Sequence, residues 1–275
     1  MIEVDDMTMS LLESPHSGLA TFLLLLVILA GSELVWPMHL SQLQPKGRLL
    51  TNFGMGVLNM ALFALLPLSL ISVAEWANQT GFGLLNMVPL GWIATAVITI
   101  LARSLTCYWL HRFSHSNPLL WRIHRVHHCD VTVDLSTGFR NHPLEALVVA
   151  ACMIIAAALI GFAPVPLAFY EGTALVFSTW SHANVRLAHW LEPLVRILLV
   201  TPDMHHVHHS AVRHETDSNY GDLFSFWDRL FGTYCSLDRA ALRGVHFGLD
   251  DIDHPASLLR QLSAPLRGTA ADQTR

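Results

Sequence analysis

Long stretches without a charged side chain dominate the first two thirds of the chain. Four of these runs are bounded by the following charged residues: Glu13 and Glu33, Arg48 and Glu75, Glu75 and Arg103, and Glu145 and Glu171. A helix needs about 20 apolar residues to cross a bilayer. The pattern therefore predicts membrane-spanning helices in 14–32 (best placed at 19–35), in 49–74 and in 76–102.

The fourth run, 146–170, contains a strong break. The sequence Gly-Phe-Ala-Pro-Val-Pro at 161–166 places two prolines close together, and proline removes a helix hydrogen bond and clashes with the preceding turn. We expect two helices, 146–162 and 166–181, in a re-entrant hairpin that enters and leaves on the same side of the membrane. A single bent span is the alternative. The amphipathic segment 187–200 is expected at the membrane interface.

The positive charges orient these helices. All 16 lysines and arginines fall at 46–48, at 103–140 or from Arg186 onward. The charged residues of the N-terminal tail and of the 75–86 loop, in contrast, are all acidic. Cytoplasmic loops are enriched in Lys and Arg. The tail and that loop are therefore predicted outside the cell, and the histidine-rich segments in the cytoplasm.

The predicted fold is an all-α integral membrane protein. It has about four transmembrane elements, including the re-entrant helical hairpin, and a cytoplasmic histidine-rich helical cap. Because no repeat or linker divides the chain, we expect one membrane-embedded domain over 1–262 and a disordered tail over 263–275.

Composition excludes several classes of protein. Hydrophobic residues make up 52% of the chain and charged residues 13%, whereas a soluble domain carries about 25% charged residues. The net charge of −5 argues against a nucleic-acid partner, which needs a basic surface. Four cysteines without a Cys-x-x-Cys spacing fit neither a disulfide scaffold nor a zinc ribbon. Histidine is unusually frequent, with 17 residues.

Many of these histidines fall in three short motifs. One His-x-x-x-His and two His-x-x-His-His motifs contain the following residues: His111 and His115; His124, His127 and His128; His205, His208 and His209. Positions i, i+3 and i+4 lie on one face of a helix, so each motif is expected to act as one ligand set. Imidazole binds iron, zinc, copper and nickel. Eight imidazoles exceed the four that one zinc ion uses, so two metal ions are favoured. Surface histidines near the membrane are the alternative.

Segments around these motifs carry a family resemblance. They are Arg140–Glu145 (RNHPLE), Trp180–Val185 (WSHANV), Val200–His205, Glu215–Gly221 (ETDSNYG) and Trp227–Tyr234 (WDRLFGTY). With the histidine motifs they resemble the integral-membrane fatty acid hydroxylase and sterol desaturase superfamily, especially its bacterial sterol desaturase-like branch. The resemblance implies a non-haem diiron enzyme of a bacterial inner membrane. Such an enzyme uses dioxygen to hydroxylate or desaturate a C–H bond of a lipid, of the sterol or fatty acyl class.

The same resemblance extends the set of candidate ligands. It implies that His182 is a ninth ligand, while Arg186 stands where some relatives have a further histidine and His206 where an arginine is common. Metal-bound imidazoles donate their other N–H to a partner. Candidates for that role are Asp134, His142, Asp217 and Asn219, with a surface or capping role as the alternative for the three Asp and Asn residues and a structural role for His142. His189 and His214 are expected at the interface or in solvent, and no role is expected for His16, His39, His246 and His254.

Oxidation of an unactivated C–H bond needs a redox metal, because side chains supply no such oxidant. The expected cofactors are two iron ions, with dioxygen as co-substrate and zinc as an adventitious replacement. The sequence has no haem-attachment, iron–sulfur or dinucleotide motif. An external ferredoxin or cytochrome with its reductase is therefore expected to supply electrons and to dock near Arg112, Arg122 and Arg125. The alternative is that these arginines only anchor the chain at the lipid headgroups. The lipid substrate is expected to enter sideways from the bilayer.

Two alternatives remain open from the sequence. A zinc-dependent membrane hydrolase of amide or ester lipids needs no electron donor, but the ligand count and the lack of a His-Glu-x-x-His motif argue against it. A non-enzymatic metal transporter or buffer would place polar ligands in the middle of the membrane, whereas these motifs lie at the ends of the predicted spans.

Overall fold

A computed structural model shows a helical protein. It describes residues 17–40, 45–249 and 257–267, and in these ranges the chain forms helices joined by turns, with three isolated β-bridges. The predicted all-α class is confirmed.

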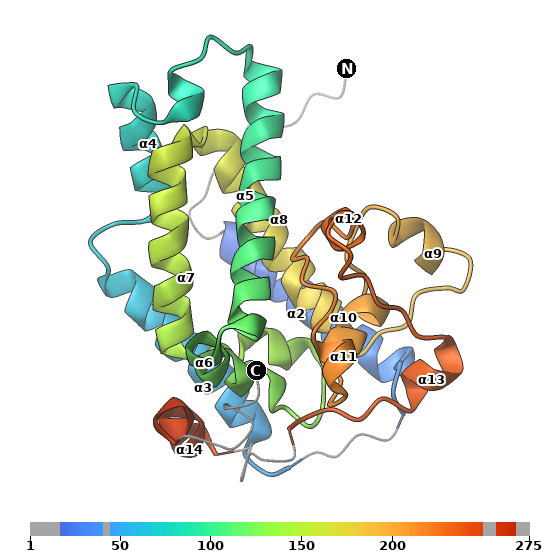
Figure 1. The fold of residues 1–275 in the computed structure, drawn as a ribbon. Helices are drawn as coiled ribbons and strands as arrows, with labels where there is room; N and C mark the ends of the chain where they lie inside the picture. Colours follow the sequence, from blue (N-terminus) through green and yellow to red (C-terminus); the bar gives the residue numbers. More distant parts are fainter. Residues whose placement is uncertain (1–16, 41–44, 250–256, 268–275) are drawn as a thin grey trace.

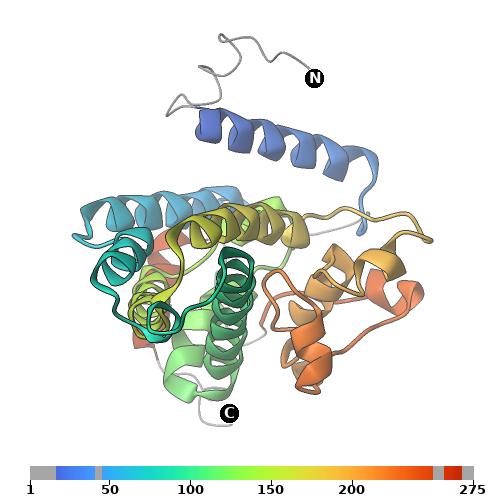
Figure 2. The ribbon, with the colours of Figure 1, turned by 90° about the horizontal axis from the view of Figure 1, so that it is seen from above.

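Two long helices stand side by side in the centre of the bundle. They are α5 (Trp92–Ser116) and α7 (Pro143–Ala156), and α3 (Arg48–Leu65) and α8 (Pro164–His182) cross beside them (Figures 1 and 2). Figure 2 shows α2 (Ser17–Val35) at the edge of the molecule. It contacts the end of α8 and the short 3-10 helix η2, which comprises residues 135–139.

Four helical segments are long and apolar enough to cross a membrane: Gly18–Val35, Arg48–Asn86, Trp92–Ser116 and Pro143–Gly161. Many of their apolar side chains are exposed, including Leu24, Val57, Ile93 and Ile155. Exposed apolar surface of this extent marks contact with a membrane or a partner. These are the helices of an integral membrane protein, as the sequence predicted.

The second span differs from the single helix expected over 49–74. It is interrupted around Pro67, which cannot donate a backbone hydrogen bond. A second helix, α4 (Leu70–Thr80), follows the break, and its first turn is capped by Ser69, whose hydroxyl accepts from the Ser72 amide. The span is therefore two helices instead of one.

The third span is shifted from the expected range 76–102. Residues 76–80 of that range belong to α4, and a turn follows in which Gly81 and Gly83 have φ angles of 71° and 92°. Helix α5 then begins at Trp92 and continues thirteen residues past Arg103, whose charge had marked the predicted end of the span.

The two helices of the predicted hairpin are present, over 143–161 and 164–182 instead of 146–162 and 166–181, and their re-entry into the membrane stays a prediction. α7 continues as a short π-helix (Ala157–Gly161), the chain turns, and α8 returns toward the end of the bundle where α7 begins (Figure 1). Its tip packs closely on the 3-10 helix η1 (Leu84–Asn86), since a Cβ added at Gly83 would lie 2.6 Å from the Ala158 carbonyl oxygen. Both arms therefore start and finish on the side of the bundle that carries the histidine motifs.

A cap of short helices lies beside α5 and α8 (Figure 1). It contains α9 (Glu192–Val195), α10 (Pro202–His208), α11 (Arg213–Thr216), α12 (Phe226–Leu230) and α13 (Arg239–Arg243). In the segment expected at the interface, 187–200, only α9 is helical, and Trp190, Leu194 and Ile197 are exposed. An apolar exposed edge is what an interfacial segment requires.

The last described helices extend slightly beyond the predicted domain end at 262. α14 (Leu258–Ser263) packs on α3, with Leu258 against Gly54, and the 3-10 helix η4 (Ala264–Leu266) follows it. Residues 268–275, most of the predicted tail, lie outside the described residues.

A network of charges around the buried Arg103 joins α5, α8 and the cap. Arg103 donates to Glu171 at 2.6 and 3.1 Å, and another of its nitrogens lies 3.5 Å from Asp222. The Tyr170 hydroxyl also donates to Asp222, at 3.0 Å. A charge inside an apolar helix is costly unless it is paired. This pairing is the reason why α5 can continue past Arg103.

Replacing Arg103 by Leu should destabilise the protein by about 3 kcal/mol, the lower end of the range for breaking a buried ion pair, because Glu171 is partly exposed. The measurement is thermal or denaturant unfolding in detergent. Arg260→Leu, which removes an exposed arginine of α14, is the control and should change stability by less than about 0.5 kcal/mol. Equal losses in the two variants would contradict the structural role of the network.

Candidate metal centre

Four helices bring the predicted ligands to one end of the bundle. α5 carries His111 and His115 one turn apart near its end, and α8 ends at His182. α6 (Pro118–His128) and α10 (Pro202–His208) carry the two His-x-x-His-His motifs. Each of these two helices starts with a capping side chain followed by proline, a combination that favours a helix start at that point.

The nine predicted ligands form two buried groups. The first group contains His111, His115, His124, His128 and His208, and the second contains His127, His182, His205 and His209. Within each group, one ring nitrogen of every histidine lies within 4.8 Å of those of the others. The groups are in contact, since the rings of His128 and His209 stack with centroids 4.7 Å apart.

Each His-x-x-His-His motif divides between the two groups, whereas the sequence analysis expected one ligand set per motif. The first and last histidines join one group and the middle histidine joins the other. Positions i and i+4 are about 40° apart around a helix, but i+3 and i+4 are about 100° apart, so the middle ring points elsewhere. The two motifs interlock as a result, because each supplies one ring to the group built by the other.

Backbone carbonyls fix the protonated nitrogen of two rings in the first group. Nδ1–H of His111 donates to the Tyr220 carbonyl oxygen at 2.9 Å, and Nδ1–H of His208 donates to that of Ser218 at 2.6 Å. Because a carbonyl oxygen only accepts, the proton must lie on Nδ1, and Nε2 of each neutral ring has a lone pair.

Carboxylates fix the protonated nitrogen of two further rings in the first group. Nδ1–H of His115 donates to Asp217 at 3.2 Å, and Nδ1–H of His124 donates to Glu145 at 2.5 Å. Such partners hold the ring orientation and make the opposite nitrogen a better donor to a metal.

The Nε2 atoms of the first group consequently face one another. His124 Nε2 lies 3.0 Å from His115 Nε2 and 3.1 Å from His128 Nε2. His128 also carries its proton on Nδ1, 3.3 Å from the Thr216 hydroxyl, because that hydroxyl donates to a carbonyl oxygen and can only accept from the ring. The other two Nε2 atoms of the group are buried and have no hydrogen-bond partner among the described residues.

This arrangement fits a metal ion. Burial and neighbouring imidazoles lower the pKa of His128, His208 and His209 well below the usual 6.5, so these rings are neutral at pH 7. Lone pairs of neutral rings that converge in a buried site repel one another unless a cation lies between them. A donor set made only of imidazole suits iron, zinc, copper or nickel. The residues present therefore fit a metal ion in each group.

Known proteins share the segment that carries this site. Residues 96–233, about half of the chain, match the fatty acid hydroxylase family, and the match includes all nine histidines. The chain belongs to the fatty acid hydroxylase family. The resemblance inferred from the histidine motifs is confirmed.

Several named proteins are similar to this family member. Alkylglycerol monooxygenase of Homo sapiens is 30% identical over 208 residues, which cover 74% of this chain and 44% of that protein. Ornithine lipid hydroxylase OlsE of Rhizobium tropici is 34% identical over 128 residues, or 46% of this chain and 38% of that protein. Sphinganine C4-monooxygenase 2 of Arabidopsis thaliana is 28% identical over 206 residues, or 72% and 74%. The chain thus spans less than half of the first two relatives. No solved structure matches it.

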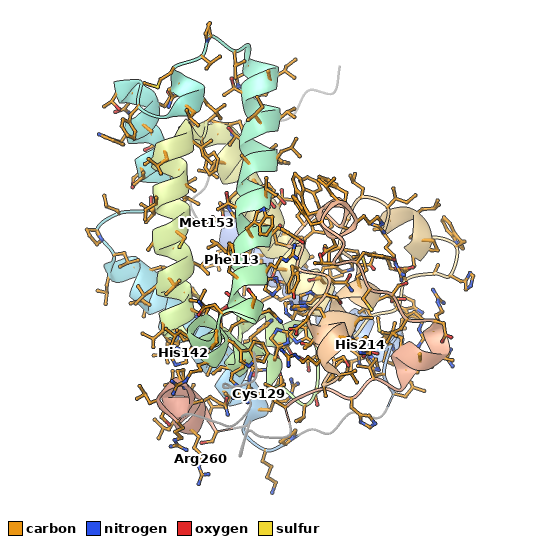
Figure 3. All side chains as sticks on the ribbon, viewed as in Figure 1. Phe113, Cys129, His142, Met153, His214 and Arg260 are labelled. Carbon is orange, nitrogen blue, oxygen red and sulfur yellow. The ribbon has the colours of Figure 1, made fainter. Side chains whose placement is uncertain are left out.

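Four residues were expected to support the candidate ligands of this fatty acid hydroxylase family member. Of these, only Asp217 forms a hydrogen bond with a candidate ligand, His115. Asp134 instead caps η2 and pairs with Arg48. Asn219 bonds to backbone groups within the cap. His142 caps α7 and lies at its base, next to α14 (Figure 3). For these three the capping or structural alternative describes the observed contacts, because each holds a turn or a helix end.

Glu145 is a supporting residue that the sequence analysis missed. It lies 21 positions after its partner His124 and on a different helix. One signal was available, since Glu145 is the only charged residue of the otherwise apolar helix α7. A lone charge at the start of such a helix indicates a buried partner.

His39 is also not the bystander expected. Its Nε2 lies 3.1 Å from Nδ1 of His206, and the two buried rings stack with centroids 5.2 Å apart. Nε2 of His206 in turn donates to the His182 carbonyl oxygen at 3.1 Å. The pair therefore supports the backbone at one of the candidate ligands. No local pattern could indicate a contact across 167 positions.

The remaining histidines are placed as expected where the structure describes them. His189, His214 and His246 are exposed, and Figure 3 shows His214 on the cap. His16 and His254 lie outside the described residues.

One part of the expected docking surface is corrected. Arg125 is only 3% exposed, so it cannot meet an electron carrier. Its position on α6, between two ligand histidines, turns it into the protein. Arg112 and Arg122 are half-buried, and Arg112 lies over the Trp109 ring at 5.2 Å.

Replacing Glu145 by Gln should weaken metal binding by the first group by roughly 10–100-fold, because the amide accepts from His124 without the negative charge. The measurement is metal content after titration with a chelator. Glu75→Gln, an exposed carboxylate at the opposite end of the bundle, is the control and should bind metal as the wild type does. A wild-type affinity in Glu145→Gln would show that the 2.5 Å contact has no influence on the site.

Proposed function

We propose that this protein is an oxygen-dependent membrane lipid hydroxylase that holds two iron ions in its two histidine groups. The observation that carries the proposal is the convergence of five buried Nε2 atoms beside a second set of four. Family membership and the names of the relatives, each a monooxygenase or a hydroxylase, support the class of reaction.

Iron bound in these groups would supply the activation of dioxygen that side chains cannot provide. Hydroxylation balances when a C–H bond, dioxygen, two electrons and two protons give C–OH and water. One oxygen atom enters the lipid and the other leaves in water. Because the sequence contains no cofactor motif for electron storage, the two electrons come from an external carrier.

The residues of this chain hold and shield the site. Asp217 and Glu145 keep a proton on Nδ1 of their partner rings, which leaves Nε2 of each ring available to a metal. Eight of the nine ligand rings are buried and the ninth is partly buried, so bulk water is largely excluded. Exclusion of water prevents loss of reactive species to side reactions.

The position of the site supports a substrate that arrives from the bilayer. His111 and His115 lie inside the candidate span Trp92–Ser116, near its end. An aliphatic chain in the adjacent leaflet therefore reaches the depth of the metal groups without leaving the membrane. Relatives named for alkylglycerol, ornithine lipid and sphinganine support a lipid substrate, and their names favour hydroxylation over desaturation.

Purified protein should contain about two irons and should oxidise lipid only when a reductase with its ferredoxin or cytochrome is added. His208→Ala should abolish turnover, because it removes one ring from a set that works as a unit. His214→Ala, on the exposed surface of the cap, is the control and should keep full activity. The measurement is metal analysis together with mass spectrometry for a gain of one oxygen. Turnover of the zinc form without oxygen would contradict the proposal and indicate a hydrolase.

We also propose that the histidine groups face the cytoplasm. The support is the placement of every Lys and Arg at 46–48, at 103–140 or from Arg186 onward in the sequence, because cytoplasmic segments are enriched in these residues. The hairpin of α7 and α8 agrees, because its two open ends lie on that same side.

A cysteine at position 87, in the turn before α5, should react with an impermeant reagent from outside intact cells, and a cysteine at position 240, on α13, only after the cells are opened. Met87 is 75% exposed and Ala240 is exposed, so both sites are accessible in the folded protein. The four native cysteines are controlled for by labelling the wild type. The reverse pattern of labelling would invert the orientation.

A further inference from the structure

A pocket of about 560 Å³ lies where the chain leaves α2. Residues from four segments line it, among them Pro37, His39, Arg186, Arg243, His246 and Phe247. It is separate from both metal groups, although His39 in its wall contacts His206, which follows a candidate ligand. The proposed reaction makes no use of this pocket.

The walls of the pocket are held in place by the backbone. Pro37 forms a β-bridge with Val185, and the Arg186 amide donates to the Trp36 carbonyl oxygen at 3.1 Å. Asn184 Oδ1 accepts from the amides of Met38 and His39 at 3.0 and 2.8 Å. The pocket is therefore a built feature of the fold.

Its charge is positive, and the Asp203 carboxylate offsets only part of the charge of Arg186 without forming an ion pair with it. Arg186 and Arg243 line the pocket, and neither forms an ion pair with a carboxylate of any described residue. Arg186 uses one nitrogen to donate to the Met38 carbonyl oxygen at 2.8 Å, which leaves its other donors available. Burial, together with the guanidinium groups of Arg243 and Arg239, lowers the pKa of Arg186. Positive groups that crowd one another in this way are stabilised by an anion.

The pocket also lies at a defined depth. It opens directly after the candidate span Gly18–Val35, and Trp36 and Leu40 beside it are 63% and 88% exposed. Tryptophan at the end of a span normally lies at the level of lipid headgroups. A pocket at this depth is open to the phosphates of the adjacent leaflet.

We propose that this pocket binds a phosphate group, with Arg186 and Arg243 as its ligands, and that a phospholipid of the surrounding leaflet supplies it. Guanidinium groups bind phosphate through paired, charge-assisted hydrogen bonds. The volume suits a single headgroup, whereas the docking of a whole electron carrier needs an extended surface. The apolar members of the wall, Pro37 and Phe247, suit the glycerol and upper acyl part of such a lipid.

The test is binding of short-chain phosphatidylglycerol to the purified full-length protein, measured by native mass spectrometry with phosphatidylcholine as the zwitterionic comparison. The double variant Arg186→Gln/Arg243→Gln should bind phosphatidylglycerol roughly tenfold more weakly, equal to about 1.4 kcal/mol. Arg260→Gln is the matched control, since it removes an exposed arginine at the far side of the molecule and should bind as the wild type does (Figure 3).

Two further measurements distinguish the proposed lipid site from a folding defect of the variants and from a site for a soluble ligand. Arg186→Lys/Arg243→Lys keeps both charges and should retain most of the binding, and metal content should be equal in all variants. Inorganic phosphate and glycerol phosphate are added as competitors. Displacement by either at low millimolar concentration, with the same dependence on the two arginines, supports the phosphate site but assigns it to a soluble phosphate compound instead of a lipid.

Three results would overturn the proposal. The first is equal binding of phosphatidylglycerol by the Gln double variant and the wild type. The second is an equal loss in Arg260→Gln, which would indicate a diffuse effect of charge. The third is a Gln double variant that binds lipid as the wild type does but is reduced more slowly by an acidic ferredoxin, which would assign the two arginines to docking of the electron carrier.

Discussion

Repulsion between converging lone pairs is the constraint on which this structure depends. In the first histidine group every Nδ1 donates outward, so every Nε2 presents its lone pair to the others. Without a cation between them these rings would turn apart, and the fold must hold each ring from behind. The partners that do so come from separate parts of the chain: Glu145 on α7, and Thr216, Asp217, Ser218 and Tyr220 in the cap. The cap and the membrane helices are therefore assembled around a single electrostatic requirement.

The second group is held by a different means. Only His182 in that group donates Nδ1–H to a described partner, the Ser178 carbonyl oxygen one helical turn earlier. Its support lies instead in the buried network beneath it, where Arg48 pairs with Asp130 at 3.0 Å and also with Asp134. Arg140 joins this network through Asn52 and holds the end of α6 through the Val126 carbonyl oxygen. The network fixes the loop after α6, and with it the helix that supplies His127.

The features that sequence predicted correctly are those written in short local patterns. The spacing of His124 to His128 selected histidines that the fold brings together in two groups, and Pro164 and Pro166 marked the break between α7 and α8. The features it missed depend on contacts between distant segments. A charge at Arg103 normally ends a membrane span, and only the partners Glu171 and Asp222, 68 and more positions away, show that it does not. Helix geometry separates the middle ring of each motif from the other two, but which group that ring joins depends on how α6 and α10 pack, which no spacing rule contains.

The paired charges of the membrane helices and the metal centre belong to one framework. Arg103 holds Asp222 of the cap against α5, and two residues earlier the Tyr220 carbonyl oxygen accepts from His111. The Asp228 carboxylate accepts hydrogen bonds from the backbone amides of Tyr220 and Gly221, at 2.7 and 3.0 Å. These two bonds fix the direction of the Tyr220 carbonyl. His111 lies two turns after Arg103 on the same helix, so the ion pair and the ligand are anchored to one loop at two points. Arg103, although it is a charged residue inside the apolar helix α5, therefore sets the position of the loop that orients His111.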